Sequence, residues 1–196
     1  MEEKTYLIFK NIHKRNTLSQ LSKIYEKFSA PEGSGDKGTA HSYIENYYHK
    51  RFDKIRLNRL NILEIGVSTG LSLEMWCEYF PYSNIIGVEL DNISYKPSTD
   101  RIKLIIGDAT DSKTFQNIDD LDIIIDDGSH VFTDQIFSYA ILYDRLKKGG
   151  IYIIEDVKNI DAVGPFFNRL SVNAKIFDFR KLKKRNDDVI IEIMKV

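Results

Sequence analysis

Residues 121–130, which read L-D-I-I-I-D-D-G-S-H, limit the possible folds of this chain more than any other stretch. A short run of isoleucines ends abruptly in two carboxylates, a glycine and a histidine. Such an apolar, β-branched run bounded by turn signals predicts a buried strand. The pattern returns at residues 149–156, G-G-I-Y-I-I-E-D. Ligands of an open α/β sheet bind beyond the carboxyl ends of its strands, so both acid pairs should face one crevice.

Strands and helices alternate over most of the chain, which predicts an α/β fold with a doubly wound, mostly parallel sheet. We expect strands at residues 61–66, 84–90, 101–106, 121–125 and 151–154, and then a strand pair at 174–182 and 188–196. The pair, joined by a basic turn at 183–186, would form an antiparallel edge. We expect helices at residues 16–28, 39–52, 71–80, 130–146 and 160–170. Asn16 or Thr17 is the candidate cap of the first helix.

The composition is that of an ordinary globular protein, because 42% of the 196 residues are hydrophobic and 29% are charged. We expect a single domain over residues 1–196, with a helical or lid segment at 1–55 and the α/β core at 60–196. A net charge of −1 gives no overall field that attracts nucleic acid or an anionic membrane. One cysteine, Cys77, excludes an internal disulfide. No apolar stretch approaches the roughly 20 residues that span a bilayer, and the N-terminus does not resemble a signal peptide. These features together predict a cytoplasmic protein.

A glycine turn, G-V-S-T-G at residues 66–70, follows the first expected strand and opens a helix. An acid about 20 residues further on, here Glu89, completes the nucleoside-binding scheme of doubly wound folds, because its carboxylate can accept both ribose hydroxyls. Ser68 stands where a dinucleotide site has its middle glycine, and residues 65–81 contain no Lys or Arg to meet phosphates. The turn therefore favours a nucleoside without phosphate, although its two glycines alone would equally suit tight packing between strand and helix.

Two further acids at strand ends suit S-adenosylmethionine, which has a ribose and a positive amino group but no phosphate. Glu64, just before the glycine turn, suits that amino group. Asp108, after the third strand, suits the adenine amino group as an acceptor. S-adenosylmethionine is therefore the expected ligand. A dinucleotide, as in an oxidoreductase, is the weaker alternative.

The order of these motifs resembles that of class I S-adenosylmethionine-dependent methyltransferases, and within them it is most similar to the metal-dependent sugar O-methyltransferases of macrolide biosynthesis. The similar motifs are L-E-I-G-V-x-x-G, I-I-G-V-E, G-D-A, D-I-I-I-D-D-G-S-H and G-G-I-Y-I-I-E-D, with G-D-K-G-T-A-H-S-Y upstream. The resemblance implies a Rossmann-like methyltransferase fold, a seven-stranded sheet with an antiparallel terminal strand, and methyl transfer to a hydroxyl of a sugar or glycosylated metabolite. The cofactor-binding residues that it implies are Lys37, Glu64, Gly66, Ser68, Glu89, Asp108, Ala109 and Asp126.

Asp127, Glu155 and Asp156 are candidate ligands of one divalent cation, because they follow two strands expected to be neighbours, about 4.8 Å apart. Oxygen ligands without cysteine favour Mg²⁺, with Mn²⁺ or Ca²⁺ as alternatives. His130, three residues beyond Asp127, is placed to remove a proton from the acceptor hydroxyl. The resemblance assigns the same roles, with His130 and Asp127 as the catalytic pair. The structural alternatives are a helix cap at residues 127–129 and a solvated loop at 155–156.

The sequence is compatible with more than one acceptor and oligomeric state. The acceptor is expected to be a small molecule rather than nucleic acid or a membrane. A sugar diol and a catechol fit equally well, and a non-catalytic nucleoside-binding protein is a further alternative. A homo-oligomer is neither required nor excluded. We expect residues 180–185, R-K-L-K-K-R, to form a solvated hairpin or, as the alternative, a phosphate-contacting edge. His41 and His49 are expected as surface or packing residues instead of ligands, while the resemblance implies that Asp36, Lys37, His41 and Tyr43 could border the cofactor or acceptor.

Overall fold

The computed structural model describes residues 18–29, 35–170 and 173–196. Within them one seven-stranded sheet has the order β3-β2-β1-β4-β5-β7-β6. Strands β1 to β5 are parallel, and β7 runs antiparallel to both β5 and β6. The predicted fold class is thus confirmed. The strands are β1 Asn61–Ile65, β2 Asn84–Glu89, β3 Ile102–Ile106, β4 Leu121–Asp126, β5 Leu146–Ile154, β6 Ala174–Asp178 and β7 Val189–Met194.

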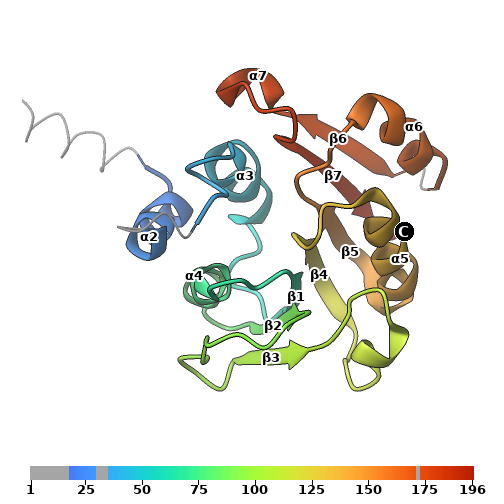
Figure 1. The fold of residues 1–196 in the computed structure, drawn as a ribbon. Coiled ribbons are helices and arrows are strands. Elements are labelled where there is room, and N and C mark those ends of the chain that lie inside the picture. The colour runs from blue at the N-terminus through green and yellow to red at the C-terminus, as the bar shows by residue number, and fades with distance from the viewer. Residues whose placement is uncertain (1–17, 30–34, 171–172) are drawn as a thin grey trace, which may run out of the picture.

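Helices cover both faces of this sheet (Figure 1). One face carries α2 Gln20–Ser29, the π-helix η1 Ile44–Tyr48, α3 His49–Phe52 and α4 Leu71–Tyr79, and the other carries α5 Phe132–Leu142 and α6 Ile160–Leu170. Short helices η2 Ser112–Phe115, η3 Tyr143–Arg145 and α7 Arg180–Lys183 lie in the connections.

Alternate residues of each strand enter two separate cores, as the two-residue period of a strand requires. In β4, Ile123 and Ile125 pack with the α2 and α4 side, while Ile124 packs with the α5 and α6 side. All three are at most 1% exposed, so the apolar run at the centre of the sequence is a doubly buried strand as predicted.

Two element boundaries differ from the sequence prediction around this strand. Helix α5 begins at Phe132 instead of residue 130, because His130 has a left-handed backbone with φ +55°. Strand β5 begins at Leu146, five residues earlier than predicted, and it contains Gly149 at φ +79°. Its pairing with β4 shifts register in the same region. The glycine pair therefore lies within the strand instead of preceding it.

The chain ends also differ from the prediction. Strand β6 stops at Asp178, and the basic run expected as part of a hairpin forms helix α7. Asp178 accepts a hydrogen bond from the Arg180 N–H at 3.0 Å, which favours the helical turn over a longer strand. At the other end, α2 begins at Gln20, and the Ser19 hydroxyl accepts from the Ser22 N–H at 3.0 Å. Ser19 is thus the cap, while the expected caps Asn16 and Thr17 lie outside the described residues.

Helix α2 and η1 share one hydrophobic core with β1, since Leu21, Ile44 and Ile62 belong to the same buried cluster. The division of the chain into residues 1–55 and 60–196 stays a prediction. In the part of the chain that the structure describes, no helix has the length and apolar character needed to cross a bilayer.

Candidate functional site

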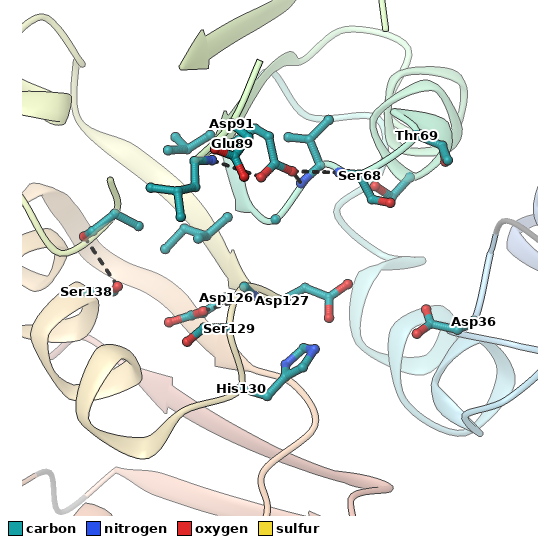
Figure 2. Close-up of a pocket in the computed structure, with 18 of the residues that line it drawn as sticks. Asp36, Ser68, Thr69, Glu89, Asp91, Asp126, Asp127, Ser129, His130 and Ser138 are labelled. Carbon is teal, nitrogen blue, oxygen red and sulfur yellow. Dashed lines mark hydrogen bonds between the residues drawn. The ribbon is translucent and has the colours of Figure 1, made fainter. Parts of the chain in front are cut away.

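A cavity of about 630 Å³ opens at the carboxyl ends of β1 to β4. This is where the strand order reverses, between β1 and β4, which is the usual ligand position in doubly wound sheets. Figure 2 shows Glu89 and Ser68 at one end of this cavity and Asp126, Asp127 and His130 at the other. Asp36 and Lys37, which precede η1 in the chain, also line this cavity. The cavity lining thus contains predicted residues of both kinds, but the predicted residues Glu64, Glu155 and Asp156 lie outside it.

The glycine turn packs closely against a distant part of the chain, which its sequence did not show. Gly66 has φ +85°, and a Cβ on it would lie 2.1 Å from the carbonyl oxygen of Asp127. The turn after β1 thus packs directly against the residues that follow β4. Ser68 also has a positive φ, +50°, and lines the cavity. The tight packing considered above is thus present in this turn, and contact with a ligand stays a prediction.

Glu89 organises the turn from the end of β2. Its Oε2 accepts hydrogen bonds from the N–H groups of Val67 and Ser68 at 2.9 and 2.8 Å, and its Oε1 accepts from that of Leu90 at 2.9 Å. Burial opposes ionisation, but these backbone bonds outweigh it and lower the pKa of Glu89. Glu89 is therefore an ionised carboxylate with a structural role in addition to the predicted contact with ribose.

Asp108 and Ala109 line the cavity just beyond β3. The Asp108 carboxylate accepts from both the hydroxyl and the N–H of Thr110 at 2.7 Å, and these bonds lower its pKa. Asp108 is exposed, so one side of its carboxylate stays accessible to a ligand. Its position beside Glu89 agrees with the predicted order of ribose and base contacts along the sheet.

Three acids meet at the other end of the cavity, around the ammonium of Lys37. Lys37 Nζ lies 2.6 Å from Asp127 Oδ2, 2.7 Å from Glu155 Oε1 and 3.2 Å from Glu64 Oε1. Burial disfavours a charged lysine here, but the three carboxylates raise its pKa well above the usual value. Tyr48 donates a further hydrogen bond to Glu155. Lys37 is thus a buried cation that holds together the ends of β1, β4 and β5.

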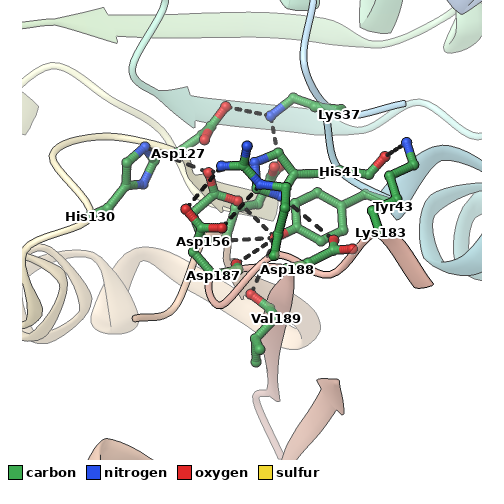
Figure 3. A network of polar contacts seen from close by, with 12 residues as sticks. Lys37, His41, Tyr43, Asp127, His130, Asp156, Lys183, Asp187, Asp188 and Val189 are labelled. Carbon is green, nitrogen blue, oxygen red and sulfur yellow. Dashed lines mark hydrogen bonds and ion pairs between the residues drawn. The ribbon is translucent and has the colours of Figure 1, made fainter. Parts of the chain in front are cut away.

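A second group of side chains surrounds Asp156 on the far side of Asp127. His130 Nε2 lies 3.8 Å and His41 Nε2 3.2 Å from Asp156 Oδ2, and the Tyr43 hydroxyl donates to Asp156 Oδ1 at 2.7 Å. Figure 3 shows these groups around Asp156. Asp156 is mostly buried, which favours its neutral form. Bonds from His41 and Tyr43 nevertheless lower its pKa.

Burial changes the protonation of three side chains that line the cavity. It raises the pKa of Asp126 to about 7, although bonds from Gly128 and Tyr152 act in the opposite direction. It also raises the pKa of Asp127 to about 7, against the influence of Lys37. Burial lowers the pKa of His130, so the imidazole is neutral near pH 7. A neutral imidazole is the form that accepts a proton.

The donor set fits a divalent cation. Glu64, Asp127 and Glu155 bring carboxylate oxygens within 4.8 Å of one another, and Asp127 belongs equally to a second such group with His130 and Asp156. Glu64 is fully buried, yet neither of its oxygens accepts a hydrogen bond within the described residues. Three carboxylates therefore share the charge of one lysine in this region. A divalent cation would reduce that excess of negative charge, and hard oxygen donors suit Mg²⁺.

Comparison with known proteins shows two similar sugar-modifying enzymes. The chain is 31% identical over 134 residues to the 8-demethyl-8-alpha-L-rhamnosyl tetracenomycin-C 2'-O-methyltransferase of Streptomyces olivaceus, covering 63% of this chain and 35% of that protein. It is 34% identical over 122 residues to the mycinamicin VI 2''-O-methyltransferase of Micromonospora griseorubida, covering 57% of this chain and 30% of that protein. The chain is a homologue of sugar O-methyltransferases. It spans about a third of the length of these two relatives.

Solved structures extend the likeness to the fold. MycE methyltransferase from the mycinamycin biosynthetic pathway, in complex with Mg, SAH and mycinamycin VI, superposes with a TM-score of 0.71 at 22% identity, covering 91% of this chain and 54% of that one. The Rossmann-like methyltransferase fold predicted above is thereby confirmed. No protein-family model matches the sequence.

Sequence reasoning missed several residues that support the site. His41 was expected as a surface or packing residue that could border the cofactor, but it is 1% exposed and lies between Asp156 and Asp188. Tyr48 and Lys183 were not selected at all. The spacing of Lys37, His41 and Tyr43 with the tyrosines after them would have been the available signal, since a run of buried polar groups on one short segment needs partners.

Proposed function

We propose that this chain is an S-adenosylmethionine- and Mg²⁺-dependent O-methyltransferase whose acceptor is a hydroxyl of a sugar or glycosylated metabolite. The observation that carries the proposal is one cavity with two chemically different ends. Glu89 and Asp108 suit a nucleoside at one end, while Asp127 and His130 suit a reacting hydroxyl at the other. We infer the class of acceptor from the two relatives, whose names specify sugar hydroxyls.

The chain's own residues would bind the donor along the sheet. Glu89 accepts from the ribose hydroxyls and Asp108 from the adenine amino group, with the N–H groups of the glycine turn already fixed by Glu89. Asp126 lines the cavity beside the methionine end, whereas Glu64 lies behind Lys37 and outside the cavity lining. We therefore infer that Asp126 meets the amino group of the donor and that Glu64 acts through Lys37.

His130 is the proposed general base. Its imidazole lines the cavity next to Asp127 and points its Nε2 toward Asp156. A base in this position takes the proton of the acceptor hydroxyl while its oxygen attacks the sulfonium methyl carbon and the carbon–sulfur bond breaks, which releases S-adenosylhomocysteine. Such bases contribute roughly 10² to 10⁴-fold. Asp127 would hold the cation together with Glu155 or Asp156, because among the described residues it shares one possible ligand group with Glu64 and Glu155 and another with His130 and Asp156. The cation would lower the pKa of the acceptor hydroxyl.

Calorimetry and two panels of acceptors, one of glycosides and one of catechols, test the proposal on the purified chain. Calorimetry should show binding of S-adenosylhomocysteine and none of NAD. Methyl transfer to a panel of simple and antibiotic-borne glycosides should occur with Mg²⁺ and cease with excess EDTA. Full transfer in EDTA would remove the cation from the proposal. Transfer to catechols alone would replace the sugar by a phenol, and tight cofactor binding without transfer to either panel would indicate a non-catalytic protein.

A further inference from the structure

The ammonium of Lys183 makes an unusual set of contacts for a surface lysine. From helix α7 it donates to the backbone carbonyl oxygens of Gly38 and Thr39, both at 2.7 Å, and to that of His41 at 2.5 Å (Figure 3 shows the contact with His41). An ammonium has three N–H groups and no acceptor. Three carbonyl oxygens from one short segment therefore satisfy it completely.

The segment that Lys183 holds, residues 35–43, carries side chains into the site from outside the sheet. Asp36 and Lys37 line the cavity, and the Lys37 ammonium reaches Asp127 and Glu155. His41 reaches Asp156 four residues later. Two of the carbonyl groups bound by Lys183, those of Gly38 and Thr39, lie between Lys37 and His41 in the chain, and the third belongs to His41 itself. Any shift of this backbone would move Lys37 and His41 together.

The Tyr25 side chain also holds this segment. The Tyr25 hydroxyl on α2 donates to the Gly35 carbonyl oxygen at 2.5 Å and accepts from the Thr39 N–H at 3.1 Å. Within the segment, the His41 N–H donates to Asp36 O at 2.8 Å and the Tyr43 N–H to Lys37 O at 2.9 Å. These internal bonds close its turns but do not attach it to the sheet. The C-terminal part of the chain holds this backbone at two places, through Lys183 at residues 38–41 and through the Asp188 carboxylate, which accepts from the Ser42 N–H at 3.1 Å.

We propose that Lys183 is a positioning residue, which fixes residues 38–41 so that Lys37 and His41 stay against the acids at the ends of β4 and β5. The contacts above support the part of this proposal in which Lys183 holds the segment. The other part, that the segment positions a cofactor and a cation, rests on the proposed function. Within the basic run, Lys183 on α7 thus has a specific contact, whereas the phosphate-contacting edge stays a prediction.

Amide hydrogen exchange on the ligand-free full chain tests the holding directly. Lys183→Met keeps most of the apolar stem and removes the ammonium, so the amides of His41 and Tyr43 should exchange about tenfold faster, equivalent to about 1.4 kcal/mol. Lys183→Arg restores a cation and should recover most of the protection. Lys181→Met is the matched control, because Lys181 lies on the same helix and makes none of these contacts. Unchanged exchange in Lys183→Met would overturn the proposal.

Binding measurements test the positioning. Lys183→Met should bind S-adenosylhomocysteine and Mn²⁺ about tenfold more weakly, while Lys183→Arg and Lys181→Met stay near the wild type and the urea midpoint of all three is unchanged. Faster exchange with unchanged affinities would leave Lys183 a purely structural contact and refute its positioning role. If the wild type bound neither probe, the proposed function would fail, and the exchange result would still decide whether Lys183 holds the segment.

Discussion

Three residues of the site have a backbone conformation that side chains usually avoid. Ser68, His130 and Asp156 have φ angles of +50°, +55° and +52°. The left-handed region costs an L-residue roughly 1–2 kcal/mol, and His and Asp are among the residues that tolerate it best. Such strain persists where the surrounding structure determines it, and it concentrates at functional sites. Here it turns His130 out of α5 and aims Asp156 at His41 and Tyr43.

His130→Asn should reduce turnover while leaving the site assembled. Asparagine also tolerates a positive φ, so the loop between β4 and α5 should keep its shape. Loss of the general base should lower kcat by about 10² to 10⁴-fold, with affinity for S-adenosylhomocysteine unchanged in calorimetry. A variant that turned over at the wild-type rate would exclude His130 as the base.

The carboxyl ends of β1 and β4 form one unit at the scale of elements. The Asp127 N–H donates to the Ile65 carbonyl oxygen at 3.0 Å, and Gly66 packs against the Asp127 carbonyl group. The glycine turn that shapes the nucleoside end and the acid pair that ends β4 therefore share a backbone contact. Movement of either element would change both ends of the cavity.

Two glycine substitutions separate backbone strain from close approach. Gly66→Ala combines a positive φ with a Cβ 2.1 Å from Asp127 O, so it should lower the free energy of unfolding by about 3 kcal/mol or more and abolish cofactor binding. Gly149→Ala has a similar φ, +79°, but its Cβ would meet nothing within 4 Å. It should cost only about 1 kcal/mol. Urea unfolding of the two variants would show equal losses if the contact with Asp127 did not matter.

At the scale of the whole molecule, the N-terminal helices are attached to the C-terminal strands by buried polar pairs. Glu192 on β7 is 2% exposed and accepts from the Tyr47 hydroxyl at 2.8 Å and from Arg51 Nε at 2.7 Å. Tyr43 reaches Asp156 from the same side. Residues from η1 and α3 thus hold β7 and the end of β5, which keeps the helical segment over the site.

Arg51→Met should destabilise the chain by about 2 kcal/mol in urea unfolding. Breaking a fully buried ion pair costs roughly 3–5 kcal/mol, and the Arg51 side chain is 32% exposed, which reduces the loss. Adding Glu192→Gln should recover much of it by removing the buried charge. Arg56→Met is the control, because its 3.9 Å pair with an exposed Asp53 should contribute well under about 1 kcal/mol. Equal losses in the two single variants would argue against the attachment.

The sequence by itself determined the sheet and the main chemistry of the site. The period of apolar residues is a local property, so the buried strand β4 and the acids that end it could be predicted from residues 121–130 alone. The alternation of strands and helices then fixed a parallel sheet, and the rule for ligand position placed Glu89, Asp108 and Asp127 at one edge of it. These predictions agree with the cavity that the structure shows.

Only the tertiary structure decided how residues far apart in the chain combine around those acids. The attachment of Lys37 to Asp127 and Glu155 joins positions 90 and 118 residues apart, and that of Lys183 to His41 joins positions 142 apart. No local pattern specifies such partners, because they depend on which face of the sheet each helix covers. Helix α7 and the left-handed turn at His130 were mispredicted for the same reason. Short segments adopt the conformation that their long-range contacts stabilise, and intrinsic preference is too weak to oppose it.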